Sequence, residues 1–261
     1  MAFKEKEDWQ LHPIGGNTGR AYMGVKSDEK VFLKRNTSPF IAALSASGIT
    51  PKLRWTQRTY SGDILTAQDW TDGELLTKDN MADEAVIKLI KDIHDSTYLL
   101  NMLRFVEGKA CRPLDLIDLY FRDLAPSLQN HHYFNQVIQS LEDSIDDDFY
   151  QADYVVCHGD LNHNNFLVSS DEQLYLVDWD NVRVADPLSD ITLLLVQYLP
   201  PSAWMEWFEA YDFNMSDSFY KRVRWYSILN CLFLIKQYFN ENRHHKLNEI
   251  VLLLKSIYEQ N

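Results

Sequence analysis

The 261-residue chain has few cysteines, no long apolar run and no apolar segment near its start. Its three cysteines, Cys111, Cys157 and Cys231, lie far apart and form no CxxC pair, which excludes a disulfide framework and favours a reducing compartment. Residues 1–8 are charged and lack the apolar centre of a signal peptide. Apolar stretches such as 193–196 are too short to span a bilayer. We therefore expect a cytoplasmic protein without membrane insertion.

Positive charge is also scarce, because 25 Lys and Arg face 38 Asp and Glu, for a formal net charge of −13. This balance argues against nonspecific binding to nucleic acid or to anionic membranes. A bound polyphosphate would need local compensation from a metal ion, a lysine or backbone N–H groups. The hydrophobic fraction of 46% is ordinary for a globular protein, and the length allows one large domain or two lobes.

Short β-like runs dominate the first part of the chain, and helical spacing dominates the rest. Strands are predicted over 9–14, 20–26, 30–35, 52–59 and 63–70, with a short helix over 40–46. Helices are predicted over 82–96, 114–128, 133–145, 188–198, 218–238 and 246–258, and short strands over 154–158, 165–168 and 174–177. The pattern predicts a small β-sheet lobe over residues 1–70 and a larger helical lobe over residues 71–261.

The strongest chemical pattern is the segment His-Gly-Asp-Leu-Asn-His-Asn-Asn over 158–165, followed by a β-like run that ends in Asp178. Phosphoryl transfer from a nucleotide needs a carboxylate that accepts the hydroxyl proton and oxygen ligands that hold magnesium. Asp160 fits the base, and Asn165 and Asp178 fit the metal ligands. The alternative is that these residues form polar turns, but the combined spacing with apolar flanks favours the chemical interpretation.

These segments resemble the Brenner-type motif of aminoglycoside phosphotransferases, choline and ethanolamine kinases and related sugar kinases. His158, Asp160 and Asn165 match the His-x-Asp…Asn loop of that superfamily, and Val-Asp-Trp at 177–179 matches its metal-binding strand end. The resemblance implies an α+β, protein-kinase-like bilobal fold with a small N-terminal β-sheet lobe and a larger, mainly helical C-terminal lobe. It also implies an ATP-dependent phosphotransferase with an alcohol acceptor, and ATP and Mg²⁺ as cofactors.

Two residues near the predicted base are expected to support it. The segment Asp-Pro-Leu-Ser-Asp at 186–190 resembles a family segment whose last aspartate anchors the catalytic loop, which implies a structural role for Asp190. His158 belongs to the catalytic motif, and we expect it to orient the loop instead of acting as a second base. A similar supporting role is expected for His94, at the end of the helix predicted over 82–96.

The N-terminal part contains three candidate nucleotide-binding segments. The glycine-rich turn at 15–19 would let backbone N–H groups approach phosphate oxygens. The run Val-Phe-Leu-Lys at 31–34 resembles a family strand whose lysine contacts the α- and β-phosphates. Gln-Asp-Trp at 68–70 has the position of the family's adenine-binding hinge, or is an ordinary linker. The candidate ATP-binding residues are Gly15, Gly16, Asn17, Thr18, Gly19, Lys34, Gln68 and Trp70.

The chain departs from kinases of this fold at two places. Those kinases pair the strand lysine with a glutamate of the following helix, but no Glu or Asp occurs between Arg35 and Gly62. Lys34 must therefore be oriented by another group, either a carboxylate from elsewhere or Asp178 itself. The second departure is Asn162, which stands where protein kinases have a lysine.

The acceptor is predicted to lie between Asp160 and the C-terminal part, which is rich in Trp and Tyr. An amino alcohol such as choline or ethanolamine would favour an aromatic cage, whereas a sugar or nucleoside would use aromatic stacking with polar groups on its hydroxyls. The sequence leaves both open. The candidate substrate-binding residues are Asn162, His163, Asp180 and Trp225, and Asp180 is also placed to reach a metal through water.

Over nearly its whole length, the chain is similar to the short bacterial branch of the superfamily, the cell-cycle regulators of the CcrZ (YtmP-like) type. The matching stretches include Gly-Gly-Asn-Thr-Gly at 15–19, Ala-Gln-Asp-Trp at 67–70 and the segment 158–165. This resemblance implies a bacterial protein linked to cell division, a ribosyl or nucleoside 5′-hydroxyl as acceptor, and recruitment to the division site by a protein such as FtsZ. The competing hypothesis is a kinase-shaped scaffold that binds nucleotide and a partner without catalysis.

Overall fold

The computed structural model describes residues 9–14 and 20–259 and divides the chain into two compact units. Unit 1 contains residues up to Leu76 together with 163–181, and unit 2 contains 77–162 and the residues from Val182 onward. The segment 163–181 therefore packs with the N-terminal strands, although it is distant from them in the sequence. The predicted phosphate-contacting turn, Gly15 to Gly19, lies outside the described residues.

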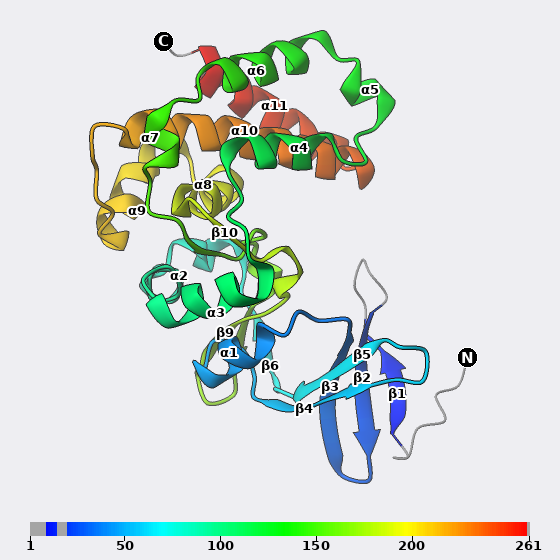
Figure 1. The fold of residues 1–261 in the computed structure, drawn as a ribbon. Helices are drawn as coiled ribbons and strands as arrows, with labels where there is room; N and C mark the ends of the chain where they lie inside the picture. The colour runs from blue at the N-terminus through cyan, green and yellow to red at the C-terminus, as the bar shows by residue number, and fades with distance from the viewer. Residues whose placement is uncertain (1–8, 15–19, 260–261) are drawn as a thin grey trace. The chain divides into compact units, whose positions relative to one another are not determined.

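Unit 1 is built on an antiparallel sheet with the strand order β1-β2-β3-β5-β4 (Figure 1). Val31 and Leu33 of β3 are buried with Leu65 and Ala67 of β5. Because side chains alternate along a strand, Lys34 of β3 points to the face opposite Leu33. The strands of this sheet are β1 (Gln10–Pro13), β2 (Ala21–Lys26), β3 (Glu29–Arg35), β4 (Leu53–Arg58) and β5 (Ile64–Asp69), and α1 (Ile41–Ala46) lies between β3 and β4.

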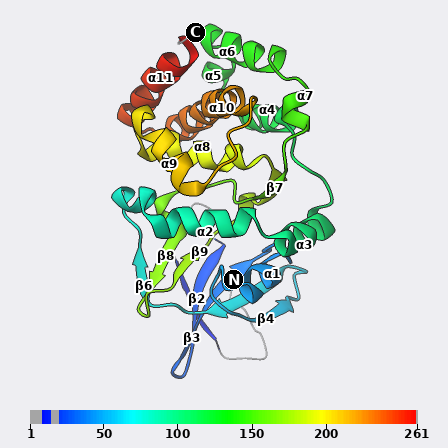
Figure 2. The ribbon, with the colours of Figure 1, turned by 90° about the vertical axis from the view of Figure 1, so that its left-hand side faces the viewer.

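A second sheet of unit 1 has the order β6-β8-β9, and Figure 2 shows its strands side by side. Gly73 permits the β6–β8 pairing, because a Cβ there would lie 2.2 Å from the carbonyl oxygen of Val168. The Leu176 N–H donates to the carbonyl oxygen of Ile49, and Trp179 packs edge-on against Phe40. These contacts fix the end of β9 beside α1. The elements are β6 (Gly73–Leu75), β8 (Phe166–Ser169), β9 (Leu174–Leu176) and the 3₁₀ turns η2 (His163–Asn165) and η3 (Trp179–Asn181).

Unit 2 is mainly helical and is centred on the long helix α10, which packs against α8 and α11 (Figure 2). A two-stranded antiparallel ladder joins β7 to β10. Its helices are α2 (Glu84–His94), α3 (Thr97–Glu107), α4 (Pro113–Phe121), α5 (Pro126–Gln129), α6 (His132–Asp143), α7 (Asp147–Tyr150), α8 (Pro187–Tyr198), α9 (Trp204–Tyr211), α10 (Phe219–Asn240) and α11 (His244–Glu259). Its other elements are β7 (Val155–Cys157), β10 (Arg183–Ala185), η1 (Lys78–Ala82) and η4 (Pro201–Ala203).

The β-rich first part and the helical remainder agree with the prediction, but several helices differ. The helix predicted over 114–128 is two helices, α4 and α5, because the chain becomes extended at Arg122 and α5 starts anew at Pro126. The sequence pattern missed α3, whose start is capped by the Ser96 hydroxyl accepting from the Leu99 N–H. It also missed α9. Among the described residues, no helix is long and apolar enough to cross a bilayer.

Candidate active site

The backbone of the predicted catalytic loop is held from two sides within unit 2. Asp190, in the first turn of α8, accepts hydrogen bonds from the N–H groups of His158 and Gly159, the latter at 2.8 Å. Gly159 has a φ of 81°, a left-handed conformation that costs glycine little. The Arg183 guanidinium donates to the Gly159 carbonyl oxygen at 3.3 Å. The backbone of the two residues that precede Asp160 is therefore held in place. No sequence signal pointed to Arg183.

The Asp160 carboxylate is half-buried and is oriented by its neighbours. The Asn162 side-chain amide donates to Asp160 Oδ1 at 2.9 Å, and the Asn162 N–H donates to the Asp160 carbonyl oxygen at 2.9 Å. His158 is buried, and its Nδ1 accepts from the Asp160 N–H at 3.2 Å. An aspartate held in this way can accept a proton from a hydroxyl group. His158 and Asn162 shape the loop around it in this structure.

Behind the loop lies a buried polar network around Asp190. His94 Nε2 is 3.6 Å from Asp190 Oδ2, and His94 Nδ1 is 2.8 Å from the Tyr211 hydroxyl. Burial alone would raise the pKa of Asp190, but the contact with His94 and the charges of His158 and Arg183 lower it below its ordinary value. Asp190 therefore stays ionised at neutral pH and keeps accepting from the loop.

In unit 1, Lys34 lies between two carboxylates of the segment that follows β9. Its Nζ is 2.6 Å from Asp178 Oδ1 and 2.7 Å from Asp180 Oδ1. Asp178 has a φ of 64°, in the left-handed region that is unfavourable for residues other than glycine. The neighbouring contacts of Leu176 and Trp179 stabilise this conformation. The orienting carboxylate expected for Lys34 is thus supplied by the predicted metal-binding segment.

The oxygen donors of unit 1 suit magnesium. Carboxylate and carboxamide oxygens are hard ligands, which Mg²⁺ prefers over nitrogen or sulfur. Asp178 and Asp180 are adjacent to Lys34, and buried Asn165 is tied to the same segment because its carbonyl oxygen accepts from the Val177 N–H at 2.8 Å. These residues fit the magnesium ion that the sequence implied.

A second cluster with potential metal ligands lies in unit 2 and does not fit an ion. The ligand atoms of His94, Cys157 and Asp190 lie within 4.8 Å of one another. Burial raises the pKa of the Cys157 thiol well above its usual range, so that the thiol stays protonated and is a poor ligand. Asp190 is already engaged by the catalytic loop.

Three other predicted site residues have packing or local roles in this structure. Gln68 is buried in β5, and its side-chain amide donates to the Pro51 carbonyl oxygen at 2.8 Å. The Trp70 ring N–H donates to Asp72 at 2.9 Å. Trp225 is 3% exposed, and its ring N–H donates to the Leu141 carbonyl oxygen at 2.9 Å. Their roles in nucleotide or substrate binding stay predictions, as does that of His163 in η2.

The aromatic side chains of the C-terminal part that suggested a cage are core residues. Six that suggested an aromatic cage are between 2% and 8% exposed. Their rings pack on one another and on neighbouring side chains; Trp207, for example, stacks on Tyr211 at 5.6 Å between ring centroids. They therefore give no support to an aromatic cage for a quaternary amine. The six are Trp204, Trp207, Tyr211, Trp225, Tyr226 and Tyr238.

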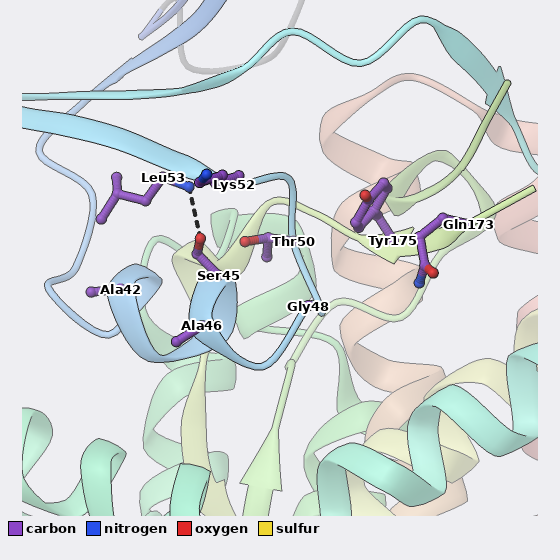
Figure 3. A pocket seen from close by; sticks show the side chains of 9 residues that line it. All are labelled: Ala42, Ser45, Ala46, Gly48, Thr50, Lys52, Leu53, Gln173 and Tyr175. Carbon is purple, nitrogen blue, oxygen red and sulfur yellow. Dashed lines mark hydrogen bonds between the residues drawn. The ribbon is translucent and has the colours of Figure 1, made fainter. Parts of the chain in front are cut away.

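Unit 1 contains a pocket of about 530 Å³ (Figure 3). The turn after α1 and the β8–β9 hairpin supply its walls, and the Ser45 hydroxyl there accepts from the Leu53 N–H at 2.7 Å. None of the predicted site residues lines it. The lining residues are Ala42, Ser45, Ala46, Gly48, Thr50, Lys52, Leu53, Gln173 and Tyr175.

Solved structures with similar folds include a choline kinase, an ethanolamine kinase and an aminoglycoside phosphotransferase. The choline kinase LicA from Streptococcus pneumoniae has a TM-score of 0.69 at 17% identity, covering 96% of this chain and 95% of that one. A Plasmodium vivax ethanolamine kinase has a TM-score of 0.63 at 13% identity, covering 95% and 81%. The GDP complex of aminoglycoside 2′-phosphotransferase-IIIa has a TM-score of 0.58 at 16% identity, covering 95% and 92%. These similarities confirm the expected protein-kinase-like α+β fold.

The family is shown by the sequence itself. A model described as the phosphotransferase enzyme family matches residues 26–226, which is most of the chain and includes Lys34, Asp160 and Asp178. The motif resemblance to aminoglycoside phosphotransferases and choline kinases is thereby confirmed at the level of the superfamily. The chain belongs to the phosphotransferase enzyme family.

Proposed function

We propose that this protein is an ATP-dependent kinase that transfers the γ-phosphate to a hydroxyl group of a small molecule. The observation that carries the proposal is the Asp160 carboxylate, half-buried, oriented by the Asn162 amide and placed on a loop whose backbone Asp190 holds. A partly exposed carboxylate contributes little to folding, so these hydrogen bonds around Asp160 are better explained by a chemical role. Membership of the phosphotransferase family supports the same reaction class.

In the proposed reaction the acceptor oxygen attacks the γ-phosphorus, its proton passes to Asp160, and the bond from the γ-phosphorus to the bridging oxygen breaks to release ADP. Lys34 contacts the phosphates, and Asp178 and Asn165 hold magnesium. Magnesium, when bound, neutralises charge on the phosphate oxygens. Because the net charge of the chain is −13, binding of the negatively charged ATP needs local positive charge, which a lysine and a bound cation supply.

We infer a ribosyl or nucleoside 5′-hydroxyl as the first acceptor to test, with choline- or ethanolamine-like alcohols second. The burial of the six aromatic side chains supports this order, because an aromatic cage for a quaternary amine needs accessible rings. The fold similarity to a choline kinase and an ethanolamine kinase keeps amino alcohols in the comparison.

The test is a transfer assay with Mg-ATP and a panel of nucleosides, sugars, amino alcohols and aminoglycosides, with the product identified by mass. Asp160→Ala should lower turnover by about 10²–10⁴-fold, the usual loss on removing a general base. The matched control is Asp217→Ala, which removes an exposed aspartate elsewhere in unit 2 and should leave turnover unchanged. If the wild-type protein phosphorylates no member of the panel, the kinase proposal fails and the scaffold hypothesis gains.

The cellular role rests on the sequence resemblance to bacterial cell-cycle regulators. On that basis we propose a function linked to cell division, with FtsZ as a partner and the division site as the location. Complementation separates the two hypotheses, because a scaffold would keep its function with Asp160→Ala and a kinase would lose it. Failure of purified FtsZ to bind the purified protein would remove the partner from this proposal.

A further inference from the structure

The catalytic lysine lacks its usual partner in this chain, and the structure supplies a different one. No Glu or Asp occurs between Arg35 and Gly62, and α1, a helix of six residues, carries no acidic side chain. The next carboxylate along the chain, Asp63, is bound to the side chains of Asn36 and Ser61. The carboxylates on Lys34 instead come from the segment after β9.

The two carboxylates on Lys34 differ in their surroundings. The Lys34 side chain is 12% exposed, the Asp180 side chain 34% and the Asp178 side chain 52%. Both distances, 2.6 Å to Asp178 and 2.7 Å to Asp180, are within hydrogen-bonding range, and an ammonium group can donate to both at once. Asp178 has the more open carboxylate of the two, and Asp180 is the more enclosed partner of the lysine.

A metal ion on Asp178 would change this arrangement. A divalent cation and the Lys34 ammonium repel one another, and both would compete for the same carboxylate oxygens. Asp180 offers a second carboxylate, so that Lys34 can remain oriented while Asp178 serves the metal. In kinases of this fold, a glutamate of the helix performs this task from outside the metal-binding segment. In this chain, the carboxylates that bind the lysine and the metal would both come from the short segment after β9.

We propose that Asp180 is the positioning residue for Lys34, in place of the missing helix glutamate. This inference rests on the proposed function, and it changes the role predicted for Asp180 from substrate binding to orientation of the lysine. Asp180 acts through Lys34, and Asp178 acts through the metal. The two aspartates, two positions apart, therefore have separable effects on nucleotide binding.

A double-mutant cycle tests this separation with Mg-ADP affinity, measured by calorimetry, as the readout. Asp180→Asn and Lys34→Met should each weaken binding by about tenfold, or roughly 1.4 kcal/mol. The double variant should bind no more weakly than Lys34→Met alone, because Asp180 has no lysine left to orient. Asp180→Glu should restore affinity to within about threefold of the wild type. Multiplying effects in the double variant would overturn the proposal and assign Asp180 directly to metal or substrate.

A metal titration at fixed ADP gives the matched control. Asp178→Asn should weaken the apparent Mg²⁺ affinity by about tenfold or more, whereas Asp180→Asn should change it by less than about threefold. An equal loss in both variants would identify Asp180 as a magnesium ligand and contradict the proposal.

A final measurement needs no nucleotide. In the ligand-free protein, the rate at which an acylating reagent modifies Lys34, followed by mass spectrometry, should rise severalfold in Asp180→Asn. The reagent attacks the neutral amine, and the loss of one of the two carboxylates that bind the Lys34 side chain leaves that amine more accessible. An unchanged rate would overturn the proposed pairing even if the protein is a kinase. A raised rate in a protein that binds no ADP would keep the pairing and overturn the proposed function.

Discussion

The charged cluster around Lys34 in unit 1 and the buried charged network of unit 2 differ in how far water reaches them. In unit 1, Lys34 meets Asp178 and Asp180, whose side chains are 52% and 34% exposed. In unit 2, the ion pair of Arg222 with Asp186 and the contact of His94 with Asp190 join side chains that are all at most 8% exposed. The first group can exchange its partners for ligand atoms, because water reaches it. The second group is closed, and each member depends on the others.

Because the two clusters differ in exposure, they are expected to contribute differently to folding stability and to ligand binding. Exposed ion pairs contribute about 0–1 kcal/mol to folding, because water and salt compete with them. Buried charges are expensive to desolvate, and removing one partner leaves the other without compensation. We therefore expect unit 2 to lose stability when its buried network is cut, and unit 1 to lose ligand binding with little change in stability.

The largest expected effect is that of Asp190→Ala. It removes the carboxylate that accepts from the N–H groups of His158 and Gly159. The free energy of unfolding should fall by about 3–5 kcal/mol, the cost of cutting a buried charged network. The matched variant Asp178→Ala in unit 1 should change it by less than about 1 kcal/mol. Urea denaturation followed by circular dichroism measures both.

Asp190→Asn tests the same point if Asp190→Ala does not fold. The amide keeps one oxygen acceptor but loses the charge, so the cost should be smaller and remain above that of Asp178→Ala. Equal losses of unfolding free energy in Asp190→Asn and Asp178→Ala would contradict the difference in stability proposed between the two clusters.

The next effect is the pH dependence of an Arg222→Met variant. Burial raises the pKa of Asp186 even though the Arg222 charge lowers it, and losing Arg222 raises that pKa further. At pH 7 the variant should be about 3 kcal/mol less stable than the wild type, because a carboxylate is left buried without its partner.

The sign of the pH effect follows from the raised pKa. Folded Asp186 binds its proton more tightly than the unfolded chain does, so the stability lost in the variant returns as the pH falls through the folded pKa toward the ordinary carboxyl value of about 3.9. Unfolding free energies of variant and wild type at several pH values measure this. Adding Asp186→Asn, which keeps an oxygen to cap α8, should remove the pH dependence. A deficit that grows on acidification would contradict the assignment.

The sequence predicted the parts of the fold and site that depend on local patterns. Strand alternation placed Lys34 on β3, and the spacing in residues 158–178 pointed to Asp160, Asn165 and Asp178 as a set with one chemistry. These signals are local because a strand, a loop and the next strand follow directly along the chain. The motif was also specific enough to indicate the family that the comparison confirmed.

Contacts between distant segments could not be predicted in this way. The sequence showed that Lys34 lacks a helix glutamate, but it left open which carboxylate replaces it, and the answer depends on how η3 packs beside β3. The aromatic residues near the C-terminus were equally ambiguous, because a Trp at helical spacing reads the same whether it lines a cage or fills a core. Trp225 is 3% exposed, which favours the core position, while its role in substrate binding stays a prediction.

The smallest expected effect is that of Tyr211→Phe, which tests how the buried network of unit 2 is oriented. Burial raises the pKa of Tyr211 far above its usual range, so its hydroxyl stays protonated and can donate to His94 Nδ1 at 2.8 Å. If Nδ1 accepts from Tyr211, the ring carries a proton on Nε2, which faces Asp190. Removing the hydroxyl should cost about 1 kcal/mol of unfolding free energy, the usual contribution of one hydrogen bond.

Nitrogen NMR of the His94 ring distinguishes this arrangement from simple packing. In the wild type, Nε2 should carry the proton and Nδ1 should have the shift of an acceptor, and Tyr211→Phe should move the Nδ1 signal toward that of an acceptor without a hydrogen bond. His94→Gln is the matched variant, because the glutamine amide can still donate to Asp190 although the imidazole ring is gone. If the wild-type proton lies on Nδ1, then Tyr211 accepts from His94, and Asp190 keeps its charge in unit 2 through the loop N–H groups and Arg183 instead of through His94.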